Sequence, residues 1–261
     1  MAKLMGVVNV TPDSFSDGGL YLDPEAAIAH GRELAEAGAE ILDVGGESTR
    51  PGAAVVAADE ELRRVVPVIR GLVDLGCAVS VDTSKAAVAA AALDAGATIL
   101  NDVTALRGDP EMAALCAERG ATVVLMHMRG DPRTMQDDPR YEDVVAEVKA
   151  FLAERLEAAK AAGIAEERIW LDPGIGFGKT AAHNMELLRR LGELRDLGRP
   201  LVIGTSRKSF IGRLDGSAAD DRLGGTIASS VLAAVEGAEV LRVHDVAEVR
   251  QALAVAAAIL G

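Results

Sequence analysis

The chain has 261 residues, of which 49% are hydrophobic and 26% are charged, a composition typical of globular proteins that excludes a disordered chain. Its net charge of −13, from 40 acidic and 27 basic residues, argues against nucleic acids or anionic membranes as partners. Two cysteines without a CxxC pair, and a start (MAKLMGVVNV) without a cleavage site, predict a cytoplasmic protein with neither disulfides nor structural zinc.

A repeated pattern runs along the chain: a helix-like stretch ends at Gly, a short apolar run follows, and a polar residue closes the run. Gly favours the left-handed residue that ends a helix, and the runs are too short for helices but suit buried parallel strands. The runs lie at 4–10, 40–44, 78–82, 98–101, 121–126, 168–172, 200–204 and 239–243. Helices are predicted between them at 24–37, 59–74, 85–95, 110–119, 141–162, 181–195, 219–236 and 245–260.

This alternation of strand and helix predicts the α/β class, as a (β/α)₈ TIM barrel that forms a single domain over residues 1–261. An open, doubly wound sheet is the competing interpretation. It is disfavoured because no GxGxxG motif follows the first apolar run.

Polar residues close the apolar runs, at the barrel end where active sites form. In chain order they are Asn9, Asp43, Asp82, Asn101, His127, Asp172, Ser206 with Lys208, and Arg242 with His244. A single strand-end Asp or Asn often only caps the next helix, but polar side chains at every strand end indicate a binding site. We expect His127 to be buried and hydrogen-bonded rather than catalytic.

Two long loops follow the first two runs, and both are rich in Gly, Pro and Ser. Long loops at the active face commonly act as lids, so we expect residues 12–22 and 45–58 to close over a ligand. Thr49 and Arg50 suit an anion, and Phe15 and Pro51 suit an apolar ring.

Three further segments bear on anions and metals. The loop DPGIGFGK permits close backbone approach to a ligand, but its spacing is one residue short of a nucleotide-binding P-loop, which we exclude. Arg207 and Lys208 in SRKS suit an anion, as barrel phosphate sites often use this loop. A hard cation such as Mg²⁺ would need oxygen ligands; Asn9 offers one, with Asp13 and Asp17 nearby in sequence.

Several longer motifs occur in order along the chain. They are NVTPDSFSDGG (9–19), DVGGESTRPGA (43–53), SVDT (80–83), NDV (101–103), LMHMRGDPRTMQ (125–136), LDPGIGFGK (171–179), SRKSFIG (206–212) and RVHDV (242–246). Together they resemble the dihydropteroate synthases, the folate-pathway enzymes that sulfonamides inhibit. The resemblance implies a Mg²⁺-dependent transferase that joins p-aminobenzoate to hydroxymethyl-dihydropterin pyrophosphate and releases pyrophosphate. It also implies a homodimer.

The resemblance assigns roles residue by residue. A pterin pocket is implied at Asp43, Asp82, Asn101, Met126, Asp172, Lys208 and Arg242. A pyrophosphate site is implied at Asn9, Arg242 and His244, with Asn9 also contacting Mg²⁺. The p-aminobenzoate side and the closing loops are implied at Phe15, Ser16, Asp17, Thr49, Arg50, Pro51, Phe177, Lys208 and Ser209. The expected catalytic residues are Asp82, Asp172, Lys208 and Arg242.

Three alternatives are weaker. A pterin-binding methyltransferase domain would lack the TRPGA and SRKS strings, which are present here. A non-catalytic pterin-binding relative would carry a damaged first or second loop, and neither looks damaged. A Schiff-base aldolase would need a strand-end lysine, for which Lys208, among basic neighbours, is the only candidate.

Overall fold

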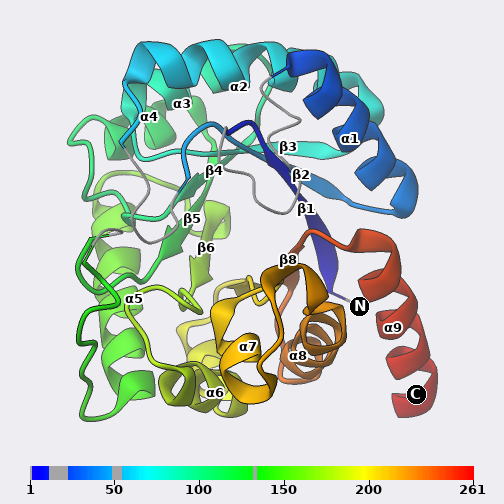
Figure 1. Cartoon of the computed structure of the whole chain (residues 1–261). Helices are drawn as coiled ribbons and strands as arrows, with labels where there is room; N and C mark the ends of the chain where they lie inside the picture. The colour runs from blue at the N-terminus through cyan, green and yellow to red at the C-terminus, as the bar shows by residue number, and fades with distance from the viewer. Residues whose placement is uncertain (1, 12–22, 49–54, 132–133) are drawn as a thin grey trace.

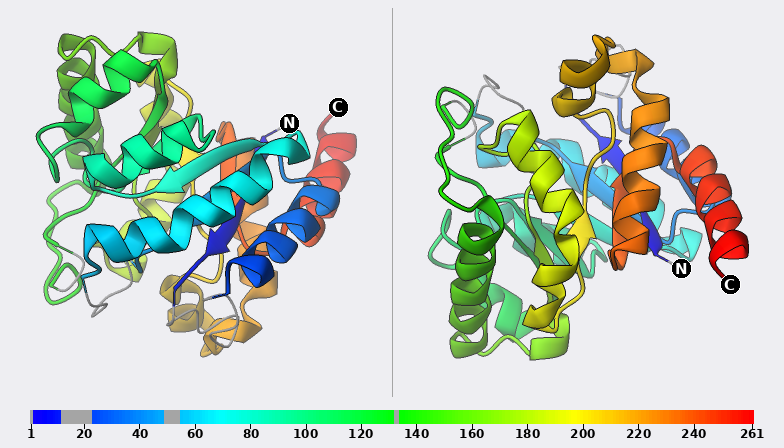
Figure 2. Two further views of the ribbon diagram at one scale, coloured as in Figure 1. Left: turned by 90° about the horizontal axis from the view of Figure 1, so that it is seen from above. Right: turned by 90° about the horizontal axis from the view of Figure 1, so that it is seen from below.

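The computed structural model describes residues 2–11, 23–48, 55–131 and 134–261. Parallel strands occupy the centre and helices surround them (Figures 1 and 2). The strands are β1 (Lys3–Asn9), β2 (Ile41–Gly45), β3 (Ala78–Asp82), β4 (Ile99–Asp102), β5 (Thr122–Met126), β6 (Ile169–Asp172), β7 (Val202–Ile203) and β8 (Val240–Val243). They follow the predicted runs closely, and the predicted (β/α)₈ fold is confirmed.

The strands form one sheet in the order β6-β5-β4-β3-β2-β1-β8-β7. The two edge strands then meet, because a parallel bridge joins Leu171 to Leu201 and the Leu171 N–H donates to the Pro200 carbonyl over 2.9 Å. This contact closes the barrel. All the carboxyl ends of the strands therefore lie at the same end of the barrel.

The main helices lie outside the strands (Figure 1). They are α1 (Pro24–Ala37), α2 (Ala58–Leu72), α3 (Ala86–Asp94), α4 (Met112–Arg119), α5 (Val144–Ala161), α6 (Ala181–Arg189), α7 (Ser209–Asp215), α8 (Leu223–Val235) and α9 (Val246–Leu260). The helix-like stretch SFIGRL that follows SRKS forms α7, and the predicted helix at 219–236 is shorter, beginning at Leu223. No helix in the described part of the chain is long and apolar enough to cross a membrane.

Local sequence explains where helices begin and end, as α1 shows. Asp23 caps its first turn by accepting from the Glu25 N–H, and Pro24 occupies the first helical position, where its missing N–H costs nothing. Gly38 ends the helix in the left-handed conformation, with φ of 106°. This fixes the turn that leads the chain into β2.

The barrel interior changes from apolar to polar along the strands. Its first layer is an apolar cluster of Met5, Ile41, Ile99, Val124, Val202 and Val240. Strand side chains alternate between faces, so the residue two positions later points inward again. In β2, β4 and β8 those residues are Asp43, Asn101 and Arg242. The apolar layer is thus the floor beneath a polar layer.

Candidate functional site

Arg242 of β8 is the centre of a buried polar network inside the barrel. Its Nε donates to Asp43 Oδ2 over 2.6 Å, and its Nη2 donates to Asp82 Oδ2 over 3.1 Å. Asn101 Nδ2 donates to the same Asp43 oxygen over 3.1 Å. Four strand-end residues from four strands therefore meet, and three of them are almost wholly enclosed by protein.

The charges in this network are strongly perturbed. Burial raises the pKa of Asp82 to about 7; the Arg242 guanidinium opposes this shift and the Asp43 charge adds to it. Burial would lower the pKa of Arg242, but Asp43 and Asp82 raise it, so the guanidinium stays protonated. Asp43 is fully buried, and its Oδ1 has no hydrogen-bond partner among the described residues. Such a site can accept hydrogen bonds from a ligand that brings its own donors.

Asp172, at the end of β6, lies beside this network and is also buried. Burial raises the pKa of its carboxyl group, while the Gly174 N–H and the positive charge of Lys208 lower it. The Gly174 N–H donates to Asp172 Oδ1 over 2.6 Å, so one carboxylate oxygen holds the following loop in place.

An aromatic and sulfur-rich wall stands next to Asp172. Phe177 packs against a cluster of Val103, Met126, Met128 and Met135, contributed by the segments after β4 and β5 and by the end of β5 itself. The Lys208 ammonium lies over the Phe177 ring, 4.2 Å from its centroid. This wall offers an apolar face and a cation to a flat, negatively charged ligand.

A second group of strand-end residues suits an anion. The Ser206 hydroxyl lies 3.0 Å from His244 Nδ1 and accepts from the His244 backbone N–H over 3.2 Å. On the neighbouring strands β1 to β3, a Cβ placed on Gly45 would lie 3.7 Å from Asp82 Cβ and 3.8 Å from Asn9 Oδ1. Glycine at this position therefore leaves open space between Asn9 and Asp82.

Arg207 does not point where the sequence suggests. Its guanidinium pairs with Asp245, with Nη2 2.6 Å from Oδ1, instead of joining Lys208 in an anion site. Its backbone has a φ of 56°, a strained value for a residue other than Gly. The Thr226 hydroxyl and the Arg222 guanidinium bind its N–H and carbonyl, and so sustain this conformation.

Lys179 and His127 form a contact that the sequence did not predict. Lys179 is 1% exposed, and its Nζ lies 2.9 Å from His127 Nδ1. Burial lowers the pKa of Lys179 to about 7, and burial together with Lys179 lowers that of His127 to about 2. His127 is buried and hydrogen-bonded, as expected. Nothing in a single sequence marks Lys179 as its partner; the only signal was its place at the end of GIGFGK.

The remaining predicted site residues are Ser209 and those that lie outside the described part of the chain. Ser209 is exposed at the start of α7. Outside the described residues lie Asp13, Phe15, Ser16, Asp17, Thr49, Arg50 and Pro51, and with them the whole of the first predicted lid and residues 49–54 of the second.

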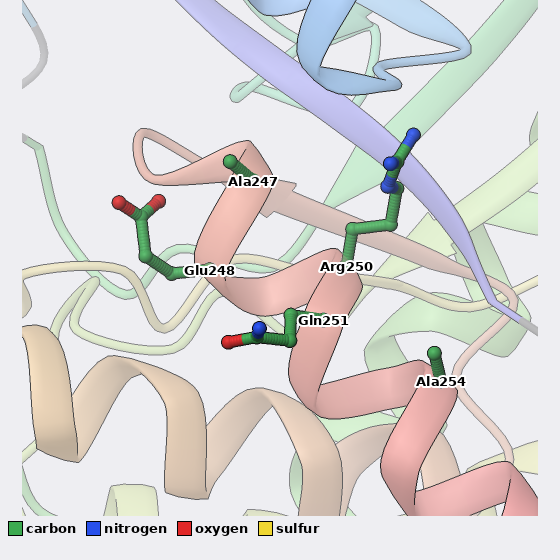
Figure 3. Close-up of a pocket in the computed structure, with 5 residues that line it drawn as sticks. All are labelled: Ala247, Glu248, Arg250, Gln251 and Ala254. Atoms are coloured by element: carbon green, nitrogen blue, oxygen red, sulfur yellow. The ribbon is translucent and has the colours of Figure 1, made fainter.

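A hollow on the outer surface lies apart from these residues. It is lined by Ala247, Glu248, Arg250, Gln251 and Ala254, all on α9 (Figure 3). No strand-end side chain contributes to it. We therefore place the site at the carboxyl ends of the strands, where the buried charges converge.

Among the described residues, no group of three His, Cys, Asp or Glu side chains is placed to hold a metal ion. The amide oxygen of Asn9, beside the space at Gly45, is a suitable single ligand for a hard cation. Mg²⁺ commonly binds through one or two protein oxygens while keeping waters and substrate phosphates. The residues present therefore fit a Mg²⁺ ion that is held mainly by a phosphorylated substrate.

Comparison with known proteins gives concordant matches. Residues 5–244 match the family described as pterin binding enzyme. The chain is 48% identical to the dihydropteroate synthase of Escherichia coli K12 over 258 residues, which covers 98% of this chain and 91% of the relative. It superimposes on a Yersinia pestis dihydropteroate synthase solved with a sulfonamide drug complex, with a TM-score of 0.96 at 45% identity, covering 99% and 94% of the two chains. A Xanthomonas albilineans dihydropteroate synthase with 4-aminobenzoic acid gives 0.93 at 52% identity, covering 100% and 93%.

Proposed function

The chain belongs to the pterin binding enzymes, within their dihydropteroate synthases, and from this premise we propose how its residues join p-aminobenzoate to hydroxymethyl-dihydropterin pyrophosphate. The observation that carries the proposal is the buried network of Asp43, Asp82, Asn101 and Arg242 above the apolar floor of the barrel. It gathers acceptors, donors and one cation at the carboxyl ends of the strands.

The pterin edge is the ligand feature that this network recognises. An amino-pyrimidinone carries N–H donors and ring acceptors side by side. Asp82 and Asp172 accept from its N–H groups, Asn101 both donates and accepts, and Lys208 donates to a ring acceptor. A ligand without those groups is rejected, because the buried polar atoms of the site would then lack partners.

A second set of residues contacts the faces of the pterin ring. Arg242 stacks on one face, as planar guanidinium groups do on aromatic rings. Met126, in the cluster around Phe177, supplies apolar contact at the pocket wall. Asp43 holds Arg242 in the orientation that this stacking needs.

The reaction breaks the bond between the pterin methylene carbon and a pyrophosphate oxygen, and the electron pair leaves with the oxygen. Arg242, His244 and Asn9 bind the departing pyrophosphate and stabilise its growing negative charge. A Mg²⁺ ion held by the Asn9 amide oxygen would supply further neutralisation of the same charge. The methylene left behind is conjugated to the electron-rich dihydropterin, so departure precedes attack, and Asp82 and Asp172 stabilise the cationic ring.

The amine nitrogen of p-aminobenzoate then donates its lone pair to the methylene carbon, forming the carbon–nitrogen bond and losing one proton to solvent. This aromatic amine is neutral at pH 7, so the step needs no strong base. Phe177 packs on its ring, and Lys208 and Ser209 meet its carboxylate, with Phe15, Ser16, Asp17, Thr49, Arg50 and Pro51 as further proposed contacts. A sulfonamide competes for the same place.

The proposal also covers the domain organisation, cellular location and oligomeric state of the protein. One domain spans residues 1–261, and the protein works in the cytoplasm, which suits its two free cysteines, Cys77 and Cys116. Two copies pair through the exposed apolar side chains of α8 and α9, among them Leu232, Val255 and Ile259.

The direct test is an assay of the purified chain with both substrates, with and without Mg²⁺, in which dihydropteroate and pyrophosphate are both measured. We expect equal amounts of the two products in repeated turnover, which requires p-aminobenzoate. Pyrophosphate release at the same rate without p-aminobenzoate would indicate a hydrolase and overturn the proposal.

A further inference from the structure

The loop between β6 and α6 folds around the side chain of its own Lys179. The Lys179 Nζ donates to the carbonyls of Gly174 and Phe177, each at 2.9 Å, and lies 2.9 Å from His127 Nδ1. An ammonium group has three donors. The three acceptors at 2.9 Å match the donors of a protonated lysine, and the His127 carbonyl oxygen lies further from Nζ, at 3.4 Å.

Two further carbonyls of this loop accept hydrogen bonds from the segment between β5 and α5. Gln136 Nε2 donates to the Gly176 carbonyl over 2.6 Å, and the Tyr141 hydroxyl donates to the Gly178 carbonyl over 2.8 Å. A Cβ on Gly174 would lie 1.9 Å from the His127 carbonyl oxygen, so this loop and the segment after β5 are packed backbone to backbone. The loop is therefore held both by the buried side chain of Lys179 and by side chains of the segment between β5 and α5.

The loop carries Phe177 towards the site. The turn closes with the Phe177 N–H donating to the Gly174 carbonyl over 3.0 Å, and this carbonyl is one of those that Lys179 binds. The Phe177 ring then lies beneath the Lys208 ammonium, 4.2 Å from its centroid. Lys179 itself is 1% exposed, too buried for its side chain to reach a substrate, so any effect on a substrate passes through Phe177 and Lys208.

We infer that Lys179 is a positioning residue for the second substrate: its ammonium group holds the β6–α6 loop in the conformation that places Phe177 under Lys208. The inference rests on the proposed function, in which Phe177 and Lys208 receive p-aminobenzoate. The charge on Lys179 is set by burial, which disfavours it, by Asp172, which favours it, and by Lys208, which opposes it. The adjacent His127 ring stays neutral and offers Nδ1 as an acceptor.

Lys179→Met keeps the length of the side chain and removes the donors. We expect KM for p-aminobenzoate to rise at least about tenfold, as for a misplaced binding group, while the Kd of the pterin pyrophosphate stays within about threefold. Lys149→Met is the matched control, because Lys149 forms a surface pair with Asp196 far from the loop, and it should change neither constant.

A double variant distinguishes this positioning role of Lys179 from a role in folding alone. In a Phe177→Ala background, Lys179→Met should raise KM for p-aminobenzoate little further, because the two residues act in series. A full additional rise, or an unchanged KM with only a lower Tm, would overturn the inference. If Lys179→Met does not fold, His127→Leu removes one acceptor and must raise KM in the same direction. A wild-type protein that forms no dihydropteroate would instead refute the proposed function.

Discussion

Arg242 and Asp43 lie 199 positions apart in the chain, yet Arg242 Nε donates to Asp43 Oδ2 over 2.6 Å. They belong to β8 and β2, which flank β1, so the pair reaches across the inner face of that strand. A buried ion pair of this kind contributes little net stability, since desolvating both charges costs about as much as their attraction returns. The proposed pterin site gives this pair a role in ligand binding instead.

The raised pKa of Asp82 predicts pH-dependent pterin binding. In the free protein burial raises this pKa to about 7, and the ligand binds the carboxylate, so binding must release a proton when the pH is below about 7. The Kd should therefore rise as the pH falls from 7 towards 5 and stay level above 8. Calorimetry at pH 6 in buffers of different ionisation enthalpy measures the released proton, which Asp82→Asn should abolish.

Asp172→Asn tests the pterin edge with little disturbance of the fold. The amide oxygen can still accept from the Gly174 N–H, while an N–H₂ group replaces the other carboxylate oxygen and faces the ligand's own donor. We expect a loss of about 1–3 kcal/mol in pterin binding. Unchanged affinity in both Asp172→Asn and Asp82→Asn would remove these carboxylates from the pocket.

The Lys85–Glu61 pair predicts a stability effect outside the site. Glu61 on α2 is fully buried, and Lys85 Nζ binds its carboxylate together with that of Glu47 at the start of the second long loop. Lys85→Met leaves a buried charge without its partner and should lower the free energy of unfolding by about 3–5 kcal/mol. Urea denaturation measures this, with the exposed Lys160→Met as a control that should change little.

Sequence periodicity predicted much of this architecture, and physical reasons limit what it could add. The short apolar runs located every strand, and the polar residue closing each run placed Asp43, Asp82, Asn101 and Arg242 at one end of the barrel. Which of these side chains form pairs depends on how the barrel closes, and no local pattern in a single sequence shows this.

The absence of a local sequence signal also explains which contacts the sequence did not predict. The contact between His127 and Lys179 joins positions 52 residues apart, on loops without periodicity. The sequence suggested Arg207 as an anion ligand. In the structure its backbone has a positive φ, and its guanidinium pairs with Asp245, 38 positions later.

His244 should contribute to catalysis less than Arg242, because its ring shares the pyrophosphate with Asn9 and Mg²⁺. The Ser206 hydroxyl, 3.0 Å from Nδ1, orients the ring. We expect His244→Ala to lower kcat by about tenfold and Ser206→Ala by less, as for partial loss of leaving-group stabilisation. His30→Ala, on the outer helix α1, is the control. An unchanged kcat in His244→Ala would place this histidine outside the leaving-group site.

The central claim is that Arg242 both binds substrate and stabilises the departing pyrophosphate. The kcat of Arg242→Ala at saturating substrates tests this claim most directly. Charge stabilisation in a closed site is felt most in the transition state, so we expect kcat to fall by about 10²–10³. Asp43→Asn combined with Arg242→Ala controls for the buried charge left unpaired, and should restore Tm but not kcat. A normal kcat in the folded fraction of Arg242→Ala, with only a lower Tm, would contradict the account.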